Sequence, residues 1–314
     1  MSITVVGSVA FDAVKTPFGE RERMLGGAAT HFALAASFFD QVHVVGRVGA
    51  DFGDEDLEVL ATRGTSIEDV ERVPDGKTFF WAGEYGWDLN SRETLDTQLN
   101  VFEHFQPRLA GSSSECEVLF LANIQPELQL SVLEQCRQVQ FVAIDSMNLW
   151  IDIARDALLD VIRRVDCVML NDAELRQLTE RPSIVTAARD VLEMGPSLVV
   201  AKQGEYGAAL ITEDQFFALP AYPLETVVDP TGAGDTFAGG FVGYLARHRD
   251  KPFTQPIVRL AMAYGTALAS FNVEEFGTER VERLTAGEVD GRVEELRRIT
   301  QFEHSLAPLE LETS

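Results

Sequence analysis

Short hydrophobic runs alternate with longer amphipathic segments along most of the chain. The β-branched runs at residues 3–9, 42–45 and 118–121 lie beside stretches whose apolar positions recur with a helical period. Continuous hydrophobic strands between amphipathic helices are typical of a parallel sheet that is covered on both faces. The pattern therefore predicts an α/β fold. Further strand and helix pairs are expected at 141–144 with 151–163, and at 167–170 with 173–179.

Two regions depart from this alternation. Residues 13–25 are polar and rich in turn formers, and residues 67–101 contain the strand-like stretch TFFWAGEYGWDL. In a strand, Phe79, Trp81, Tyr85 and Trp87 would share one face. Such a stripe either packs within its own domain or, in a small projecting sheet, covers a ligand or a second subunit. We expect one domain, 1–314, with a lid formed from about 12–25 and 67–101.

The segment 227–240, VVDPTGAGDTFAGG, is followed directly by apolar helical sequence. Gly232, Ala233 and Gly234 are small enough for their backbone N–H groups to approach a ligand, and a helix N-terminus favours an anion. A glycine turn before a helix is also common as plain punctuation between a strand and a helix. The segment is therefore a candidate phosphate cradle.

Asp235 stands at the start of the same predicted helix. A carboxylate there can cap the helix. It can also take the proton of a hydroxyl whose oxygen attacks a phosphoryl group held by the adjacent amides. The two roles are compatible, and the sequence leaves both open.

Four segments in this order, GGAATHFALAAS, NDAE, VVAKQGEYGAAL and DPTGAGDTFAGG, resemble the ribokinase/PfkB family of carbohydrate and nucleoside kinases. The resemblance spans residues 3–277, and the last segment is its most specific part. It implies a ribokinase-like three-layer α/β/α fold with a mainly parallel central sheet and a small β-sheet lid. It also implies ATP-dependent phosphorylation of a hydroxyl group, with ATP and Mg²⁺ bound.

The resemblance assigns roles to single residues. Asp235 matches the catalytic base, and residues 232–234 match the anion hole for the β- and γ-phosphates. Asp229 matches a residue that helps to hold K⁺ in potassium-activated members. Asn171 and Glu174 match the pair that organises Mg²⁺ and the triphosphate through water, although NDAE alone is also a helix-capping pattern.

Other positions match the substrate and nucleotide sites of the family. Asp12 and the Gly26-Gly27 turn match substrate-hydroxyl and close-approach positions in the N-terminal half. The positions expected beside ATP are Lys202, Gly204, Gly207 and Thr231, with Ala267, Ser270 and Asn272 placed against the base by position only.

Two positions differ from many sugar kinases of the family. Those enzymes have Asn two residues before the first Asp and Asn four residues after the glycine pair, whereas this chain has Ala10 and His31. The differences argue against the standard sugar substrates. His31 is either a substrate-hydroxyl ligand or a histidine satisfied within its own helix.

Charge and cysteine content limit the partners. Fifty acidic residues against 26 basic ones give a formal charge of −24 and a pI of about 4.5, which disfavours nucleic acid and anionic membranes. Three cysteines without CxxC spacing do not indicate a disulfide framework or zinc site. No signal peptide or membrane span is predicted, so a cytoplasmic protein is expected.

Together these observations predict an ATP- and Mg²⁺-dependent kinase, with K⁺ as a further candidate ion, that phosphorylates a primary hydroxymethyl group of a sugar or sugar-like molecule. A nucleoside kinase of the same family is one alternative. A non-catalytic sugar or nucleotide sensor on the kinase fold is another. A homodimer formed through the lid is expected from the aromatic stripe and the exposed sheet edges, with a monomer as the alternative.

Overall fold

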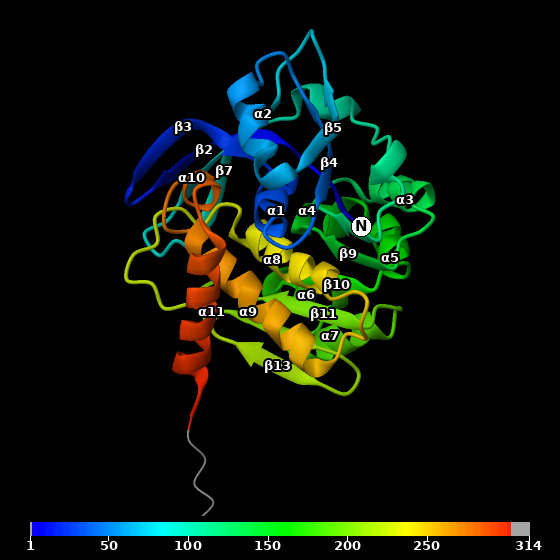
Figure 1. Cartoon of the computed structure of the whole chain (residues 1–314), viewed down its shortest axis with the longest axis vertical. Helices are drawn as coiled ribbons and strands as arrows, with labels where there is room; N and C mark the ends of the chain where they lie inside the picture. Colours follow the sequence, from blue (N-terminus) through cyan, green and yellow to red (C-terminus); the bar gives the residue numbers. More distant parts are fainter. Residues whose placement is uncertain (1, 303–314) are drawn as a thin grey trace, which may run out of the picture.

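The computed structural model describes residues 2–302 and consists of a large sheet between helices and a smaller sheet at one side (Figure 1). The large sheet has the order β13-β12-β11-β10-β9-β8-β1-β4-β5. Every neighbouring pair is parallel except β11–β12 and β12–β13. Its strands are β1 (Ile3–Val6), β4 (Val42–Val48), β5 (Ser66–Arg72), β8 (Val118–Leu121), β9 (Phe141–Asp145), β10 (Cys167–Asn171), β11 (Leu198–Lys202), β12 (Ala208–Ile211) and β13 (Phe216–Leu219).

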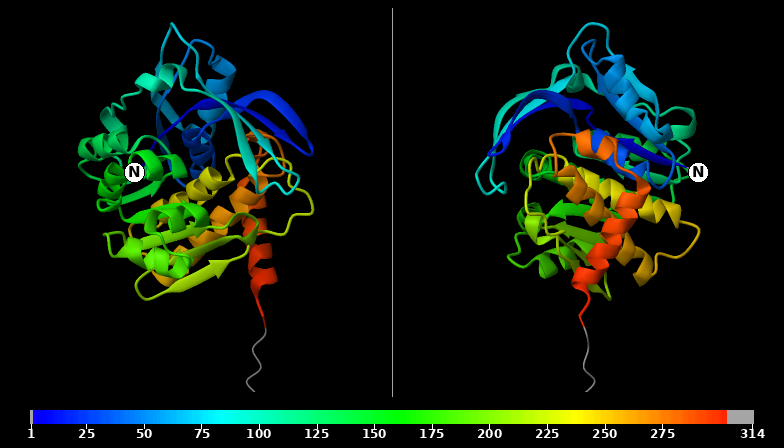
Figure 2. Two further views of the ribbon diagram at one scale, coloured as in Figure 1. Left: turned by 180° about the vertical axis from the view of Figure 1, so that it is seen from behind. Right: turned by 60° about the vertical axis from the view of Figure 1, so that its left-hand side comes forward.

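Helices cover both faces of this sheet, which confirms the predicted α/β architecture (Figures 1 and 2). One face packs against α1, α8 and α9, and the other against α3, α5, α6 and α7. Within residues 2–302 no helix has the length and apolar content needed to cross a bilayer. The helices are α1 (Ala28–Ala36), α2 (Asp54–Leu60), α3 (Pro126–Gln135), α4 (Asn148–Ile153), α5 (Arg155–Ile162), α6 (Asp172–Thr179), α7 (Ile184–Leu192), α8 (Ala233–Arg247), α9 (Gln255–Asn272), α10 (Glu279–Glu282) and α11 (Ala286–Thr300).

Helix α8 is held unusually close to its two neighbours. A Cβ built on Gly239 would lie 2.3 Å from the Phe32 carbonyl oxygen of α1. One built on Gly240 would lie 2.9 Å from the Cα of Gly265 in α9. Because these glycines let backbones touch, α8 is wedged between α1 and α9, and the position of its N-terminus is fixed by the core.

The second sheet is the predicted lid, with the order β3-β2-β6-β7, and it arches beside the start of α8 and α10 (Figure 2). The expected lid boundary was wrong at one end, because residues 67–72 pair with β4 as part of β5 in the large sheet. The expected domain ends, residue 1 and residues 303–314, lie outside the described part of the chain. The lid strands are β2 (Ala10–Thr16), β3 (Gly19–Gly26), β6 (Phe79–Tyr85) and β7 (Arg92–Gln98).

The aromatic stripe is only partly as expected. Tyr85 packs with Val14 and Phe276, and Trp81 lies against the same cluster. Trp87 follows the end of β6 and is 89% exposed, so it does not share the strand face. Most of the stripe therefore packs within its own domain.

Candidate active site

Three polar residues end three adjacent strands of the large sheet. Asp145 ends β9, Asn171 ends β10 and Lys202 ends β11. Ligands of open α/β sheets bind beyond the carboxyl ends of the strands. The Lys202 ammonium bonds to the Asp145 carboxylate, which is buried. Sequence reasoning missed Asp145, and its signal was an aspartate that closes the apolar run FVAI.

The glycine turn before α8 faces this group. Gly232 is the N-cap residue with φ +74°, and α8 begins at Ala233. A Cβ on Gly234 would lie 3.3 Å from Lys202 Nζ. Residues 231–235 are only half-buried. The Thr231 amide donates to Asp229 Oδ1 and the Ala233 amide donates to the Pro230 carbonyl oxygen at 3.3 Å, so Gly232 and Gly234 are the turn residues whose amides are candidates to bind a ligand. The turn, the N-terminus of α8 and the lysine together form a candidate anion site.

Asp235 is the third residue of α8 and not its cap, because Gly232 occupies the N-cap position. Of the two roles that the sequence left open for Asp235, that of the N-cap residue belongs to Gly232 instead. Burial, reinforced by the charge of Asp145, raises the pKa of Asp235 from 3.8 to about 7, while Lys202 opposes the shift. A carboxyl group with a pKa near neutrality is suited to take a proton from a hydroxyl.

Lys202 remains a cation in this environment. Burial alone lowers the pKa of the ammonium, but the carboxylates of Asp145, Glu174 and Asp235 outweigh burial and raise the pKa above 10.5. The site thus keeps one fixed positive charge beside the glycine turn.

Asn171 and Glu174 form the predicted capping box at the start of α6. The Glu174 amide donates to Asn171 Oδ1, and the Asn171 amide donates to Glu174 Oε2, both at 2.8 Å. Burial raises the pKa of Glu174 to about 7. Within residues 2–302 no three His, Cys, Asp or Glu side chains converge to hold a metal. Glu174 and Asp145 fit Mg²⁺ bound through water and phosphate oxygens, which is how this ion commonly binds.

Asp229 is fully buried behind the glycine turn. Its Oδ1 accepts the Thr231 amide at 2.9 Å and its Oδ2 accepts the Gly277 amide at 3.0 Å. Burial raises the pKa of this carboxyl group. Asp229 therefore ties the turn to the loop before α10, and its role toward K⁺ stays a prediction.

The acceptor side of the site is built from β2 and the glycine pair. Asp12 of β2 is 6% exposed, and a Cβ on Gly26 would lie 2.0 Å from its Oδ2. Gly27 has φ +95°, and a Cβ there would lie 2.5 Å from the Ser8 carbonyl oxygen. Burial, with a smaller contribution from the charge of Asp229, raises the pKa of Asp12 to about 7. The glycine pair is thus required for the close approach that the sequence predicted.

The lid adds a cation that sequence reasoning missed. The Arg92 guanidinium at the start of β7 lies 5.2 Å from the centre of the Trp81 ring. Its charge lowers the pKa of Asp12 and Asp235, against the larger effect of burial. The available signal was that Arg92 is the single basic residue among residues 78–100.

The lid tip touches the nucleotide side at two points. The Thr231 hydroxyl donates to Tyr85 Oη at 3.2 Å, and Asn90 Nδ2 donates to Glu205 Oε1 at 2.9 Å. Glu205 lies in the turn between β11 and β12, where Gly204 and Gly207 have φ values of +56° and +97°. The lid is therefore docked against both the glycine turn and the expected nucleotide turn.

The positions expected against the nucleotide base lie deeper than predicted. Ala267 and Asn272 have no exposed surface, and the Ser270 hydroxyl donates to the Ala267 carbonyl at 2.6 Å. Both polar atoms of the Asn272 side-chain amide, Oδ1 and Nδ2, form hydrogen bonds within the protein. Direct base contact by Ala267 and Asn272 is thus corrected to an internal role. His31 is also buried, 3% exposed, beneath the glycine turn and not at an open acceptor surface.

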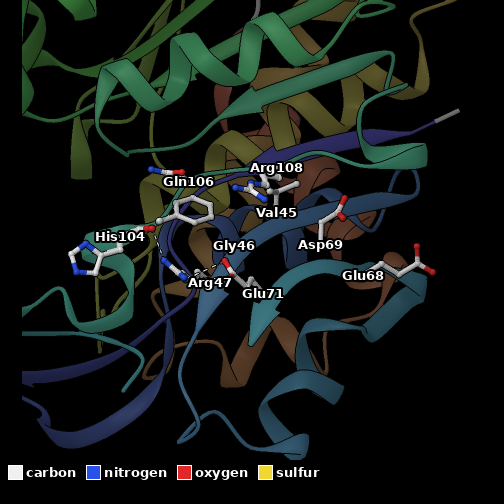
Figure 3. Close-up of a pocket in the computed structure, with 10 residues that line it drawn as sticks. Val45, Gly46, Arg47, Glu68, Asp69, Glu71, His104, Gln106 and Arg108 are labelled. Atoms are coloured by element: carbon white, nitrogen blue, oxygen red, sulfur yellow. Dashed lines mark hydrogen bonds and ion pairs between the residues drawn. The ribbon is translucent and has the colours of Figure 1, made fainter. Parts of the chain in front are cut away.

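A separate cavity of 440 Å³ lies at the edge of the large sheet (Figure 3). It is lined by β4 and β5 and by residues around the short 3₁₀ segment η2 (Asn100–His104). Arg47 pairs there with Glu71 and donates to the Val101 carbonyl oxygen. Its lining mixes acidic and basic side chains and includes none of the site residues described above.

Comparison with known proteins identifies the family of the chain. The family model described as pfkB family carbohydrate kinase matches residues 2–283. A cytidine kinase of Thermococcus kodakarensis is 31% identical over 79% of this chain and 90% of that protein. Relatives at 24–27% identity are named deoxyribokinase, fructokinase and ribokinase.

Solved structures share the fold at low sequence identity. A Burkholderia thailandensis nucleoside kinase in complex with ADP and inosine superimposes with a TM-score of 0.76 at 18% identity, covering 98% of this chain and 100% of that one. An Escherichia coli putative ribokinase II in complex with ATP and Mg²⁺ gives 0.74 at 20%, covering 94% and 99%. The chain belongs to the pfkB family of carbohydrate kinases, ATP-dependent phosphotransferases that act on sugars or nucleosides.

Proposed function

We propose that the chain transfers the γ-phosphoryl group of ATP to the primary hydroxymethyl group of a ribonucleoside. The observation that carries the proposal is the placement of a half-buried carboxyl group, Asp235, in the first turn of α8 beside the glycine turn of residues 232–234. The 31% identity to a cytidine kinase over most of both chains favours a nucleoside as acceptor. Free sugars are the second candidate, because relatives named for them match the same part of the chain.

Asp12 and Asp235 have different roles toward the acceptor: Asp12 binds it and Asp235 removes its proton. The buried Asp12 carboxylate faces Asp235 closely enough for their charges to interact, and it binds acceptor hydroxyls as a hydrogen-bond acceptor. Asp235 takes the hydroxymethyl proton while the acceptor oxygen forms its bond to the γ-phosphorus. The bond from that phosphorus to the β–γ bridging oxygen breaks, and ADP leaves with the electron pair.

Hydrogen-bond donors and cations in fixed positions stabilise the negative charge of the phosphoryl group during transfer. The glycine turn of residues 232–234 and the Lys202 ammonium face the phosphates, and the Arg92 charge of the docked lid, which acts on Asp12 and Asp235, adds a second cation to the site. Mg²⁺, when bound through Glu174 and Asp145, neutralises phosphate charge. The docked lid excludes water, which would otherwise accept the phosphoryl group.

A coupled ADP-release assay tests the proposal. The wild-type chain and Asp235→Asn are assayed with Mg-ATP, with and without K⁺, against ribonucleosides, deoxyribonucleosides, pentoses, hexoses and inositols. We expect release that depends on a ribonucleoside and falls about 10³- to 10⁴-fold in Asp235→Asn, with ATP affinity nearly unchanged. Equal turnover in the variant would remove the base. Release with free sugars alone would select the second candidate, and ATP binding without release would favour the sensor.

The same proposal includes activation by K⁺, a cytoplasmic location and a homodimer formed through the lid. Activation by K⁺ would support the cation role of Asp229. A cytoplasmic location is supported by three buried cysteines that remain as free thiols. Sedimentation of the chain at 34.7 kDa would sink the lid-to-lid homodimer.

A further inference from the structure

The imidazole ring of His31 lies flat beneath the glycine turn. His31 belongs to α1, and its side chain has almost no exposed surface. A Cβ built on Gly232 would lie 2.4 Å from Cε1, Nδ1 and Nε2 of the ring alike. Equal distances to three ring atoms place that point above the face of the ring and not at its edge. Gly232 therefore rests on the imidazole with its Cα, and no larger residue fits between them.

Asn272 fixes the ring from the side. Its Nδ2 donates to the Thr231 carbonyl oxygen at 2.7 Å, and a carbonyl oxygen can only accept. Asn272 Oδ1 is therefore the atom that lies 3.1 Å from His31 Nδ1 and accepts the Thr236 hydroxyl at 3.0 Å. It follows that Nδ1 of His31 carries the hydrogen.

The remaining ring nitrogen is an acceptor without a partner. Burial lowers the pKa of His31 to about 4, so the ring is neutral at physiological pH. Nε2 then bears a lone pair, and this buried atom has no hydrogen-bond partner. The lone pair lies in the plane of the ring, whereas Gly232 rests on the face, so the contact with the turn does not use Nε2.

The turn is consequently held at several successive points. The Thr231 amide donates to Asp229, and the Thr231 carbonyl oxygen accepts from Asn272. The His31 ring supports Gly232, and the Thr236 hydroxyl donates to Asn272. These contacts come from α1, α9 and the loop before the turn. Taken together, they set where the amides of residues 232–234 point.

We propose that His31 is a positioning residue: a neutral imidazole platform, locked by Asn272, that sets the height of the Gly232 turn against the β- and γ-phosphates of the nucleotide. The inference rests on the proposed function and gives this position a task different from contact with the acceptor. The ring supports the turn by its face, and an asparagine side chain at this position would offer only a smaller planar group.

Nucleotide binding tests the platform without relying on turnover. Dissociation constants for ADP and AMP are measured by calorimetry for His31→Asn, His31→Phe and the wild type. His43→Phe is the matched control, because His43 is also a buried histidine but lies in β4, outside the site. We expect His31→Asn to weaken ADP about tenfold and to leave AMP unchanged, since AMP lacks the phosphates that the turn holds. His31→Phe keeps a flat ring and should lose less than His31→Asn.

Kinetics then separate positioning from acceptor binding. We expect kcat of His31→Asn to fall about 10²-fold, as misplacement of reacting groups does, with the acceptor KM within about twofold of the wild type. The shape of the pH profile should stay unchanged because the ring is neutral throughout. A raised acceptor KM with ADP binding intact would overturn the proposal in favour of direct acceptor contact. Equal weakening of ADP and AMP would overturn it in favour of general loosening.

A double-mutant cycle between Gly232 and His31 is a second, independent test of the contact between the turn and the ring. Gly232→Ala places a Cβ against the ring, whereas His31→Ala removes the ring. We expect Gly232→Ala to weaken ADP less in the His31→Ala background than in the wild type, a coupling that additive effects would contradict. If Asp235→Asn shows that the chain is not a kinase, the ADP-to-AMP comparison and this cycle still decide the role of His31.

Discussion

The glycine turn and the lid meet at the same site but are held in different ways. Behind the turn, Asp229, His31 and Asn272 are buried and bond to one another or to the backbone of the turn. The lid strand β7 is exposed along its whole length, and the lid tip is docked by two side-chain hydrogen bonds. The turn is thus part of the core, while the outer strand and the tip of the lid are surface elements, although the inner lid strand β2 is buried.

The difference indicates a division of labour. A turn fixed by buried contacts presents its amides without reorganisation, which is what stabilisation of a transferring phosphoryl group requires. An outer lid strand and tip held by few side-chain hydrogen bonds open at small cost, which substrate entry and product release require. Variants of the two sides should therefore separate stability from turnover.

The two cations of the site give the largest expected contrast. Lys202→Met leaves the buried Asp145 carboxylate without its partner and should destabilise the fold by about 3–5 kcal/mol. Arg92→Met removes an exposed charge, so we expect an unchanged melting temperature and a fall in kcat/KM of about 10²-fold. Thermal denaturation and steady-state kinetics of both variants measure the contrast.

Matched variants control this comparison. Arg21→Met in β3 removes another exposed lid arginine, one that lies over Phe276, and should leave kcat/KM unchanged. Equal loss of stability in Lys202→Met and Arg92→Met would contradict the view that only the turn side is built into the core.

The raised pKa values of two carboxyl groups in the site give the next largest effect, a dependence of stability on pH. Asp12 and Asp235 have pKa values of about 7 in the fold against 3.8 ordinarily, with burial as the main cause. From about pH 4 to about pH 7 the unfolded chain has released these protons while the folded chain retains them, so their contribution to stability falls as pH rises and is lost above about pH 7. Melting temperatures without nucleotide and Mg²⁺ should decline across this window.

Substitution by asparagine tests the assignment. Asp12→Asn and Asp235→Asn cannot ionise, so each should remove its share of the decline and be more stable than the wild type near pH 8. An identical slope in the wild type and both variants would show that other groups are responsible.

The lid contacts give the smallest expected effect. Tyr85→Phe and Asn90→Ala each remove one hydrogen bond at the lid tip, which is worth about 1 kcal/mol. We expect kcat/KM to fall by up to about fivefold, with product release faster than in the wild type. Pre-steady-state measurement of ADP release checks the direction, and slower release would argue against the lid as the gate.

Much of the fold followed from local pattern. The alternation of buried runs and amphipathic segments specifies parallel strands and covering helices, because both depend on neighbouring residues. The Gly232 turn and the Asn171–Glu174 capping box were equally accessible, since their chemistry lies within a few residues. The break at Ala154 between α4 and α5 was not, because apolar spacing continues across it.

Asp145, which was missed, and His31, which was named but given another role, act through partners distant in sequence. Asp145 gains its meaning from Lys202, 57 residues later, and His31 from Asn272, 241 residues later. No local pattern marks such pairs, since only the fold brings them together. Arg92 depends on how the lid is placed over the site, which its exposed polar strands do not encode.

The glycines that wedge α8 between α1 and α9 have a consequence for how this protein can change over evolution. Every replacement of a glycine by another amino acid adds at least a Cβ, and at Gly239 and Gly240 that atom would meet backbone or packed core. Helix α8, which carries Asp235, therefore does not tolerate single substitutions at these glycines. The exposed strands of the lid tolerate them, so new acceptor preferences can arise there while the phosphoryl-transfer machinery is inherited intact.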